Sequence, residues 1–320
     1  MQALSRRELL KTGGAGLAGA AMLAGGGAMA AQESPAPKTP EPKRDRWILA
    51  LNASTIRPAS LDDKISAAAK AGYDGIELWL NDLDAYEKSG KPLADLGKQI
   101  KDAGLSVPNV IGIFGAMPAA DEDKAKATDG FKQKMRQAAA VGGRHIAMVP
   151  GPDRPDLDIL WAARRYAELI DAGKECGIAP ALEFLSTMKS IHTLGQAAAI
   201  VMESGRSEGT IVADTFHMYN GGSQWSGVPF LSGSIYAVWH MNDVPAQGEA
   251  GKMKDSDRIY PGDGVLPLKT LLKDLWQTGF RGPLSLELFS RAEWAKPPAE
   301  VAKVGIDKMR AVIAASGTGA

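Results

Sequence analysis

The sequence predicts an α/β fold in which one parallel sheet closes into a (β/α)8 TIM barrel. Short apolar runs alternate eight times with helix-like segments between residues 47 and 314. These runs are mostly continuous rather than alternating, which is typical of strands that helices cover on the outside. An open doubly wound sheet, the alternative, is expected to carry a glycine-rich phosphate motif after its first strand, and residues 52–55 hold none. A chain of this length therefore favours the closed barrel.

The composition excludes several classes of protein. The 320 residues are 45% hydrophobic and 23% charged, which is ordinary for a globular chain and excludes a disordered, coiled-coil or multi-span membrane protein. Lys plus Arg equals Asp plus Glu at 37 each, without the basic excess of a nucleic-acid binder. Cys176 is the only cysteine, so no internal disulfide is expected.

The first 45 residues have the pattern of an export signal and a tether. Arg6-Arg7 precede an uncharged Gly/Ala-rich run, and Ala28-Met29-Ala30 supplies small residues for cleavage before Ala31. The twin arginine resembles a Tat signal, which implies periplasmic export of an already folded protein. A membrane anchor is the alternative, although seven glycines between positions 13 and 27 disfavour a spanning helix. We predict a signal peptide at 1–30, a Pro-rich linker at 31–45 and a catalytic barrel at 46–317.

The first half of the chain predicts four strand–helix units, and a glycine marks the end of each helix. Strands are predicted over residues 47–53, 75–79, 105–111 and 145–149. The helices between them are predicted over 60–71, 93–103, 123–141 and 156–176. Each helix is followed by glycine, a common carboxyl-terminal cap.

The second half repeats this order with one weak helix. Strands are predicted over residues 178–184, 210–215, 235–241 and 283–289. Helices are predicted over 191–203, 266–277 and 299–314, whereas the Gly/Ser-rich stretch 220–233 predicts only a short helix. The count of eight units completes the barrel.

Four consecutive predicted strands place an ionisable side chain inside an apolar run. They are Glu183, Asp214, His240 and Glu287. Barrel chemistry lies at the carboxyl ends of the strands, so these groups are expected to converge there. Buried carboxylates need a partner, and these strands carry no Arg or Lys, so we predict a divalent ion rather than core ion pairs. The mostly oxygen donor set suits Mn²⁺ or Mg²⁺ and does not exclude Zn²⁺ or Co²⁺.

Four further residues are candidates for substrate binding. His217 follows the sixth strand, and Asp243 follows the seventh. Arg258 lies on a long polar loop, where it could grip a hydroxyl or a carboxylate, and a surface role is the alternative. Glu77, in the second strand, is equally compatible with lining the pocket and with a core ion pair.

The motifs around these residues resemble the xylose-isomerase-like TIM-barrel family of sugar phosphate isomerases and epimerases. The similarity rests on ALEF, ADTFH, HMND, DRIYPGDG and LSLELF, extends over residues 51–313, and is nearest to the inosose (2-keto-myo-inositol) isomerase subgroup. It implies that Glu183, Asp214, His240 and Glu287 are the metal ligands and that His217 and Arg258 contact substrate. Ile259 stands where the related three-metal endonucleases have a second histidine, so one metal and no phosphodiester cleavage are expected.

These observations predict an isomerase or epimerase of an unphosphorylated keto-sugar or keto-inositol. Proton transfer next to a carbonyl would proceed through an enediolate, with the ion as Lewis acid and Glu183 and Glu287 as the acid–base pair. A keto-sugar or keto-glycoside lyase or dehydratase using the same site is the first alternative, and an exported sugar-binding protein the second. No nucleic acid and no membrane insertion after cleavage are expected, and a homo-oligomer is left open.

Overall fold

The computed structural model describes residues 45–118, 121–154 and 157–319. The predicted signal peptide, and all of the predicted linker except Asp45, lie outside the described residues. Export and cleavage therefore stay predictions.

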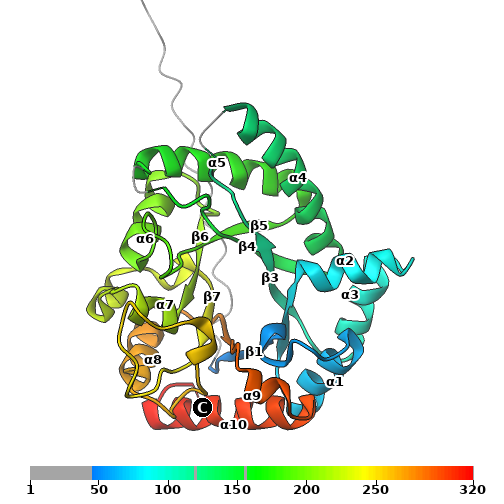
Figure 1. The fold of residues 1–320 in the computed structure, drawn as a ribbon, viewed down its shortest axis with the longest axis vertical. Coiled ribbons are helices and arrows are strands. Elements are labelled where there is room, and N and C mark those ends of the chain that lie inside the picture. The colour runs from blue at the N-terminus through cyan, green and yellow to red at the C-terminus, as the bar shows by residue number, and fades with distance from the viewer. Residues whose placement is uncertain (1–44, 119–120, 155–156, 320) are drawn as a thin grey trace, which may run out of the picture. The chain divides into compact units, whose positions relative to one another are not determined.

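Eight parallel strands close into one barrel in sequence order, which confirms the predicted fold class (Figure 1). Each strand pairs with its neighbours in the sequence, and the first pairs with the last through Ile48–Pro283 and the following residues. The strands are β1 Ile48–Asn52, β2 Gly75–Trp79, β3 Val107–Ile113, β4 Gly143–Met148, β5 Ala179–Glu183, β6 Thr210–Asp214, β7 Tyr236–Met241 and β8 Pro283–Leu286.

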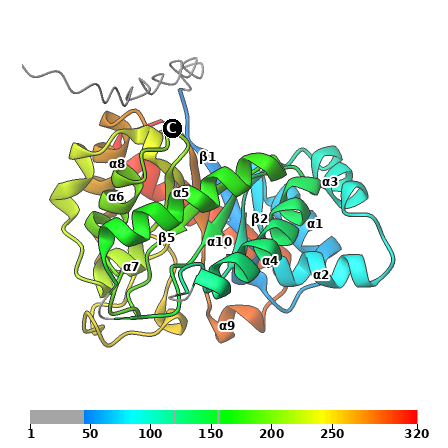
Figure 2. The same cartoon turned by 90° about the horizontal axis from the view of Figure 1, so that it is seen from above.

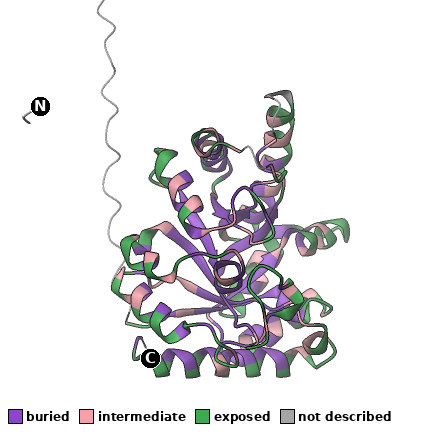
Figure 3. Ribbon diagram, turned by 60° about the vertical axis from the view of Figure 1, so that its left-hand side comes forward, coloured by how far each residue is buried: buried purple, intermediate pink, exposed green. Residues whose placement is uncertain are grey.

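Helices surround the strands, and the longer ones bury one face against them (Figure 3). They are α1 Leu61–Ala71, α2 Leu80–Lys88, α3 Leu93–Asp102, α4 Asp121–Ala140, α5 Ile159–Cys176, α6 Leu194–Glu203, α7 Thr215–Asn220, α8 Leu268–Gln277, α9 Arg291–Trp294 and α10 Pro298–Ser316.

Local capping explains where the helices begin and end. Ser60 accepts a hydrogen bond from the Asp63 amide at the start of α1, and Gly72 ends that helix in the left-handed conformation. Asp158 and Gly177 do the same for α5.

Three short helices after strands were not predicted from the sequence. α2 follows β2 directly and buries Leu80 and Leu83, although its nine residues are otherwise polar. α7 follows β6 because the Asp214 carboxylate accepts the amide hydrogens of Phe216 and His217. α9 has four residues, too few for a periodic apolar pattern.

The barrel interior holds an apolar cluster and a polar group of side chains. Small and branched side chains form the apolar cluster, which consists of Ile111, Ala147, Ala181, Val212 and Ala237. A hydrogen-bonded layer of Asn52, Glu77, Asn109, Ser285 and His240 adjoins the carboxyl ends of the strands. The interior therefore positions polar groups under the mouth of the barrel.

The two ends of the barrel are well separated (Figure 2). β1 enters at the upper edge of that view, and α9 lies at the lower edge, where the strands end. Cys176 is buried and unpaired as predicted. Among the described residues, no helix has both the length and the apolar character needed to cross a bilayer.

Candidate metal centre

The four predicted ligands converge where β5 to β8 end. Nδ1 of His240 lies 3.2 Å from Glu287 Oε2, 3.5 Å from Asp214 Oδ2 and 3.6 Å from Glu183 Oε1. All four side chains are buried. Ligand atoms of Asp214, His240 and Glu287 lie within 4.8 Å of one another, so these three can hold a metal ion. Glu183 borders the same point from β5.

The orientation of the His240 ring fits a metal ligand. Nε2 lies 3.0 Å from Glu77 Oε1, which makes it the protonated nitrogen when the imidazole is neutral. Nδ1 is buried and makes no hydrogen bond, although three carboxylates surround it. Without an ion, and despite the burial of His240, the carboxylates of Glu287 and Glu77 raise its pKa well above the usual value, so Nδ1 carries a proton. A divalent cation would take the place of that proton, and one imidazole nitrogen among carboxylates is a donor set that fits such an ion.

The carboxylates of this site differ in their protonation. Burial raises the pKa of Glu183 to about 8, against the charge of His240, and the nearby Glu287 and Asp214 carboxylates add to the rise. Burial also opposes ionisation of Asp214, but the charge of Arg258 and the neighbouring His240 hold its pKa well below the usual value. In the absence of an ion, one carboxylate of the cluster therefore keeps a proton at neutral pH.

Asp214 uses its two oxygens for different purposes. Oδ1 caps α7, and Asn242 Nδ2 also donates to it at 3.2 Å. Oδ2 faces His240 and Arg258. The helix that begins at Thr215 therefore fixes the carboxylate in place.

Arg258 reaches into the cluster from the loop after β7. Its Nη1 donates to Asp214 Oδ2 and to Glu287 Oε2, both at 2.6 Å. We predicted a divalent ion rather than core ion pairs because the four strands carry no cationic residue, and this guanidinium corrects that argument. A buried ion-pair network is present, and its cation comes from a loop.

His217 was predicted to bind substrate, and the structure places it against Arg258. Its Nε2 accepts a hydrogen bond from Arg258 Nη2 at 3.2 Å, and its Nδ1 lies 3.0 Å from Ser186 Oγ. Burial lowers the pKa of His217 to about 4, so the ring is neutral at pH 7. Its Nε2 can accept a hydrogen bond from Arg258, or from a substrate hydroxyl that takes the place of the guanidinium.

Glu77 was a candidate for substrate binding, and the structure places it in a buried hydrogen-bonded network. It is fully buried and accepts hydrogen bonds from Asn52, Asn109 and Ser285, besides its pair with His240. These partners surround both carboxylate oxygens. Glu77 therefore lies behind the His240 ring rather than on an open pocket.

Asp243 also departs from its predicted role. Its carboxylate accepts the amide hydrogens of Val244, Gly262 and Leu266. A side chain with these three partners organises the loop that carries Arg258. It takes no part in the cluster around His240.

Sequence reasoning missed the amides and hydroxyls that complete the site. Asn52 Nδ2 bridges Glu77 at 2.7 Å and Glu287 at 3.1 Å. Asn109 and Ser285 occupy inward positions of β3 and β8. Their signal is a polar residue inside a buried strand, which marks a hydrogen-bonded position but not a particular partner.

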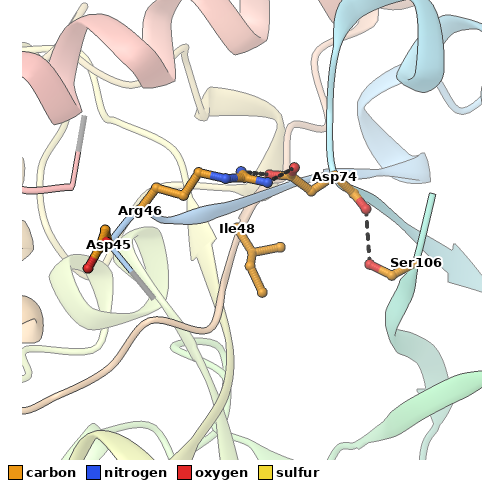
Figure 4. Close-up of a pocket in the computed structure, with 5 residues that line it drawn as sticks. All are labelled: Asp45, Arg46, Ile48, Asp74 and Ser106. Carbon is orange, nitrogen blue, oxygen red and sulfur yellow. Dashed lines mark hydrogen bonds and ion pairs between the residues drawn. The ribbon is translucent and has the colours of Figure 1, made fainter. Parts of the chain in front are cut away.

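An open pocket lies at the opposite end of the barrel (Figure 4). It is lined by Asp45, Arg46, Ile48, Asp74 and Ser106. Arg46 and Asp74 form a two-pronged ion pair at 2.8 and 2.9 Å, and Ser106 Oγ donates to the Asp74 carbonyl. This pocket is remote from the metal residues.

The molecule is thus a closed α/β barrel with a cluster of buried carboxylates and imidazoles at its mouth, three residues of which could hold a metal ion. Residues 65–312 match the xylose isomerase-like TIM barrel family, and the chain belongs to that family. The chain is 35% identical over 257 residues to an inosose isomerase of Halalkalibacterium halodurans, covering 78% of this chain and 90% of that protein.

The chain is also similar to two other proteins. The chain is 24% identical over 247 residues to a 3-dehydroshikimate dehydratase of Pseudomonas aeruginosa, covering 77% of this chain and 38% of that protein. A crystal structure of the IOLI protein with a bound zinc atom has a TM-score of 0.78 and 23% identity, covering 84% of this chain and 98% of that chain.

Proposed function

We propose that this protein is a divalent-metal-dependent isomerase or epimerase of a keto-sugar or keto-inositol. The observation that carries the proposal is the buried Nδ1 of His240, which makes no hydrogen bond although three carboxylates surround it. The similarity to inosose isomerases supports the reaction class. Isomerases and epimerases of the same fold recur among the relatives, which supports a sugar substrate.

Glu183, Asp214, His240 and Glu287 would hold the ion. When bound, a divalent cation supplies Lewis acidity to a substrate carbonyl and its neighbouring hydroxyl. The zinc atom of the IOLI structure supports a metal in a barrel of this fold, and the mostly oxygen donors favour Mn²⁺ or Mg²⁺. Metal analysis of the purified protein identifies which of these ions is bound.

Two carboxylates would perform the proton transfer. Glu183 and Glu287 approach the His240 ring from β5 and from the end of β8, with β6 and β7 between them. One takes the proton on the carbon next to the carbonyl, and the other returns a proton to the neighbouring position. No atom is lost, so the product has the mass of the substrate.

Replacing either carboxylate tests this role. Glu183→Gln and Glu287→Gln are each expected to lower solvent deuterium incorporation into inosose at least 100-fold, because amides do not exchange the proton. Exchange is followed by NMR after metal loading, and substrate binding is measured separately by calorimetry. Wild-type rates of exchange in both variants would overturn the acid–base assignment.

Product mass separates the second candidate, a lyase or dehydratase. The relationship to a 3-dehydroshikimate dehydratase favours it, because loss of a β-substituent begins with the same proton removal. A product lighter than the substrate assigns the lyase. Binding without exchange in the wild type instead assigns a sugar-binding protein.

We also propose that the protein acts in the periplasm. The twin arginine and the Ala28-Met29-Ala30 site support Tat export and cleavage before Ala31. The amino-terminal sequence of protein recovered from the periplasm tests both points. A cytoplasmic protein that keeps residues 1–30 would overturn them.

A further inference from the structure

Arg57 lies at the mouth of the barrel, and no carboxylate of the described residues pairs with it. It ends the short 3₁₀ helix Ala53–Ile56 that follows β1, so it lies at the same end of the barrel as the metal residues. It is exposed, and within the described residues no acidic group forms an ion pair with it. Arg258, the guanidinium within the metal cluster, pairs with three carboxylates, whereas Arg57 pairs with none among the described residues.

Three aromatic rings enclose the Arg57 guanidinium. Its central carbon lies 4.6 Å from the centre of the Trp79 ring, 5.5 Å from that of Phe289 and 6.0 Å from that of Trp294. Trp79 ends β2, Phe289 follows β8 and Trp294 ends α9, and β2 and β8 flank β1 in the barrel. Aromatic faces attract a guanidinium but leave its N–H groups without acceptors.

The enclosing rings are themselves fixed by hydrogen bonds. Trp79 Nε1 donates to Asn52 Oδ1 at 2.9 Å, and Trp294 Nε1 donates to the Ser54 carbonyl at 2.8 Å. Pro58 follows Arg57 and restricts the backbone there. The guanidinium is therefore held in place before any ligand arrives, which lowers the entropy lost on binding.

Arg57 is also connected to the metal residues. Asn52, which fixes Trp79, donates to Glu287 at 3.1 Å. The Phe289 ring that contacts Arg57 also lies 5.1 Å from the guanidinium carbon of Arg258, which binds Asp214 and Glu287. A small molecule on the metal residues would thus extend toward Arg57.

We propose that Arg57 is a specificity-determining residue that binds a carboxylate on the substrate. A planar guanidinium with unused N–H groups forms two parallel hydrogen bonds with a carboxylate. The preferred substrate is then a keto-sugar acid or a carboxylated keto-cyclitol rather than an uncharged keto-sugar. This inference rests on the proposed function, because it assumes that the carbonyl of the substrate lies at the metal residues.

Two probes that differ in charge test the proposal with the metal-loaded full chain. 3-Dehydroshikimate carries a ring carboxylate, and inosose carries none. Arg57→Met is expected to raise the dissociation constant of 3-dehydroshikimate about 10- to 100-fold, the usual range for a charge-assisted pair, and that of inosose less than twofold. Arg57→Lys keeps the charge but loses the planar fork, so an intermediate effect is expected. Calorimetry gives both constants.

Arg291→Met is the matched control, because Arg291 is exposed in α9 at the same end of the barrel. Equal weakening in both Met variants would assign the effect to general surface charge and overturn the proposal. If Arg57→Met weakened the binding of both probes equally and lowered the melting temperature, Arg57 would have a structural role between loops, and the proposal would be overturned. Failure of the wild type to bind 3-dehydroshikimate would also overturn it.

Deuterium exchange separates this inference from the proposed function. If deuterium exchanges into inosose but Arg57→Met binds 3-dehydroshikimate as the wild type does, the carboxylate site is rejected and the isomerase is retained. Arg57-dependent binding of 3-dehydroshikimate without exchange into either probe rejects the isomerase and retains the carboxylate site.

Discussion

Glu77 acts through His240 rather than on a ligand of its own. Its carboxylate holds Nε2 of the imidazole at 3.0 Å, and three neutral donors hold the carboxylate. A carboxylate in this position fixes the tautomer of the ring and makes the opposite nitrogen more basic. The buried charge of Glu77 therefore explains why Nδ1, and not Nε2, faces Asp214 and Glu287.

Replacing Glu77 tests this dependence. Glu77→Gln is expected to weaken Mn²⁺ or Zn²⁺ binding about 10- to 100-fold, since the amide is a weaker partner for the imidazole. Calorimetric titration of metal into the metal-free protein gives the affinity directly. Glu203→Gln, on an exposed helical position, is the control that should leave the affinity unchanged. Equal affinities for Glu77→Gln and the wild type would show that His240 needs no such partner.

At the scale of elements, Asp carboxylates in the loops at the carboxyl ends of the strands accept hydrogen bonds from backbone amides. Asp243 organises the loop that carries Arg258. Asp153, in the loop after β4, accepts the amide hydrogens of Lys189 and Ser190 in the loop after β5. These contacts make the mouth of the barrel a connected set of loops.

The Asp153 contact predicts a pH dependence of stability. Although its desolvation acts in the opposite direction, hydrogen bonds from the Lys189 and Ser190 amides lower the pKa of Asp153 in the folded chain. Its contribution is therefore present above the unfolded pKa, about 3.9, and is lost as pH falls through the lower folded value. Asp153→Asn should melt below the wild type at pH 7, with the gap closing below pH 4. A gap that stays constant with pH would assign the difference to packing.

The whole molecule combines a stable barrel with a polar site that needs a cation. In the described structure Arg258 supplies that charge to Asp214 and Glu287. A divalent ion bound to the same oxygens would compete with the guanidinium for them. Metal binding and the position of Arg258 are therefore coupled.

Removing Arg258 tests this coupling without reference to activity. Arg258→Met should destabilise the metal-free protein by about 3 kcal/mol, because two buried carboxylates lose their cation. Added Mn²⁺ should then raise the melting temperature of the variant more than that of the wild type. Scanning calorimetry with chelator and with metal measures both. If metal raised the two melting temperatures equally, the ion and Arg258 would not share ligands.

Most of the architecture was predictable because it depends on local signals. Apolar runs and glycine stops located the eight strands and the long helices to within a few residues. Helices α2, α7 and α9 escaped because their polar or short sequences lack periodicity. Strand β8 ends at Leu286 rather than Phe289, so Glu287 lies just past it.

Only the part of the candidate site that lies at the ends of strands was predictable from the sequence. Convergence of Glu183, Asp214, His240 and Glu287 follows from barrel topology once the strands are known. The entry of Arg258 depends on how a loop folds back, and no spacing rule along the chain specifies that path. The same limit applies to Arg57, whose meaning depends on rings from β2 and β8.

The ion pair between Arg46 and Asp74 has a practical consequence for protein engineering. It fastens the first described residues to the amino-terminal rim, at the end where β1 enters. An affinity tag or a fusion partner joined ahead of Asp45 would meet the barrel on that rim. Immobilisation through this terminus should accordingly leave the opposite opening accessible to dissolved reagents.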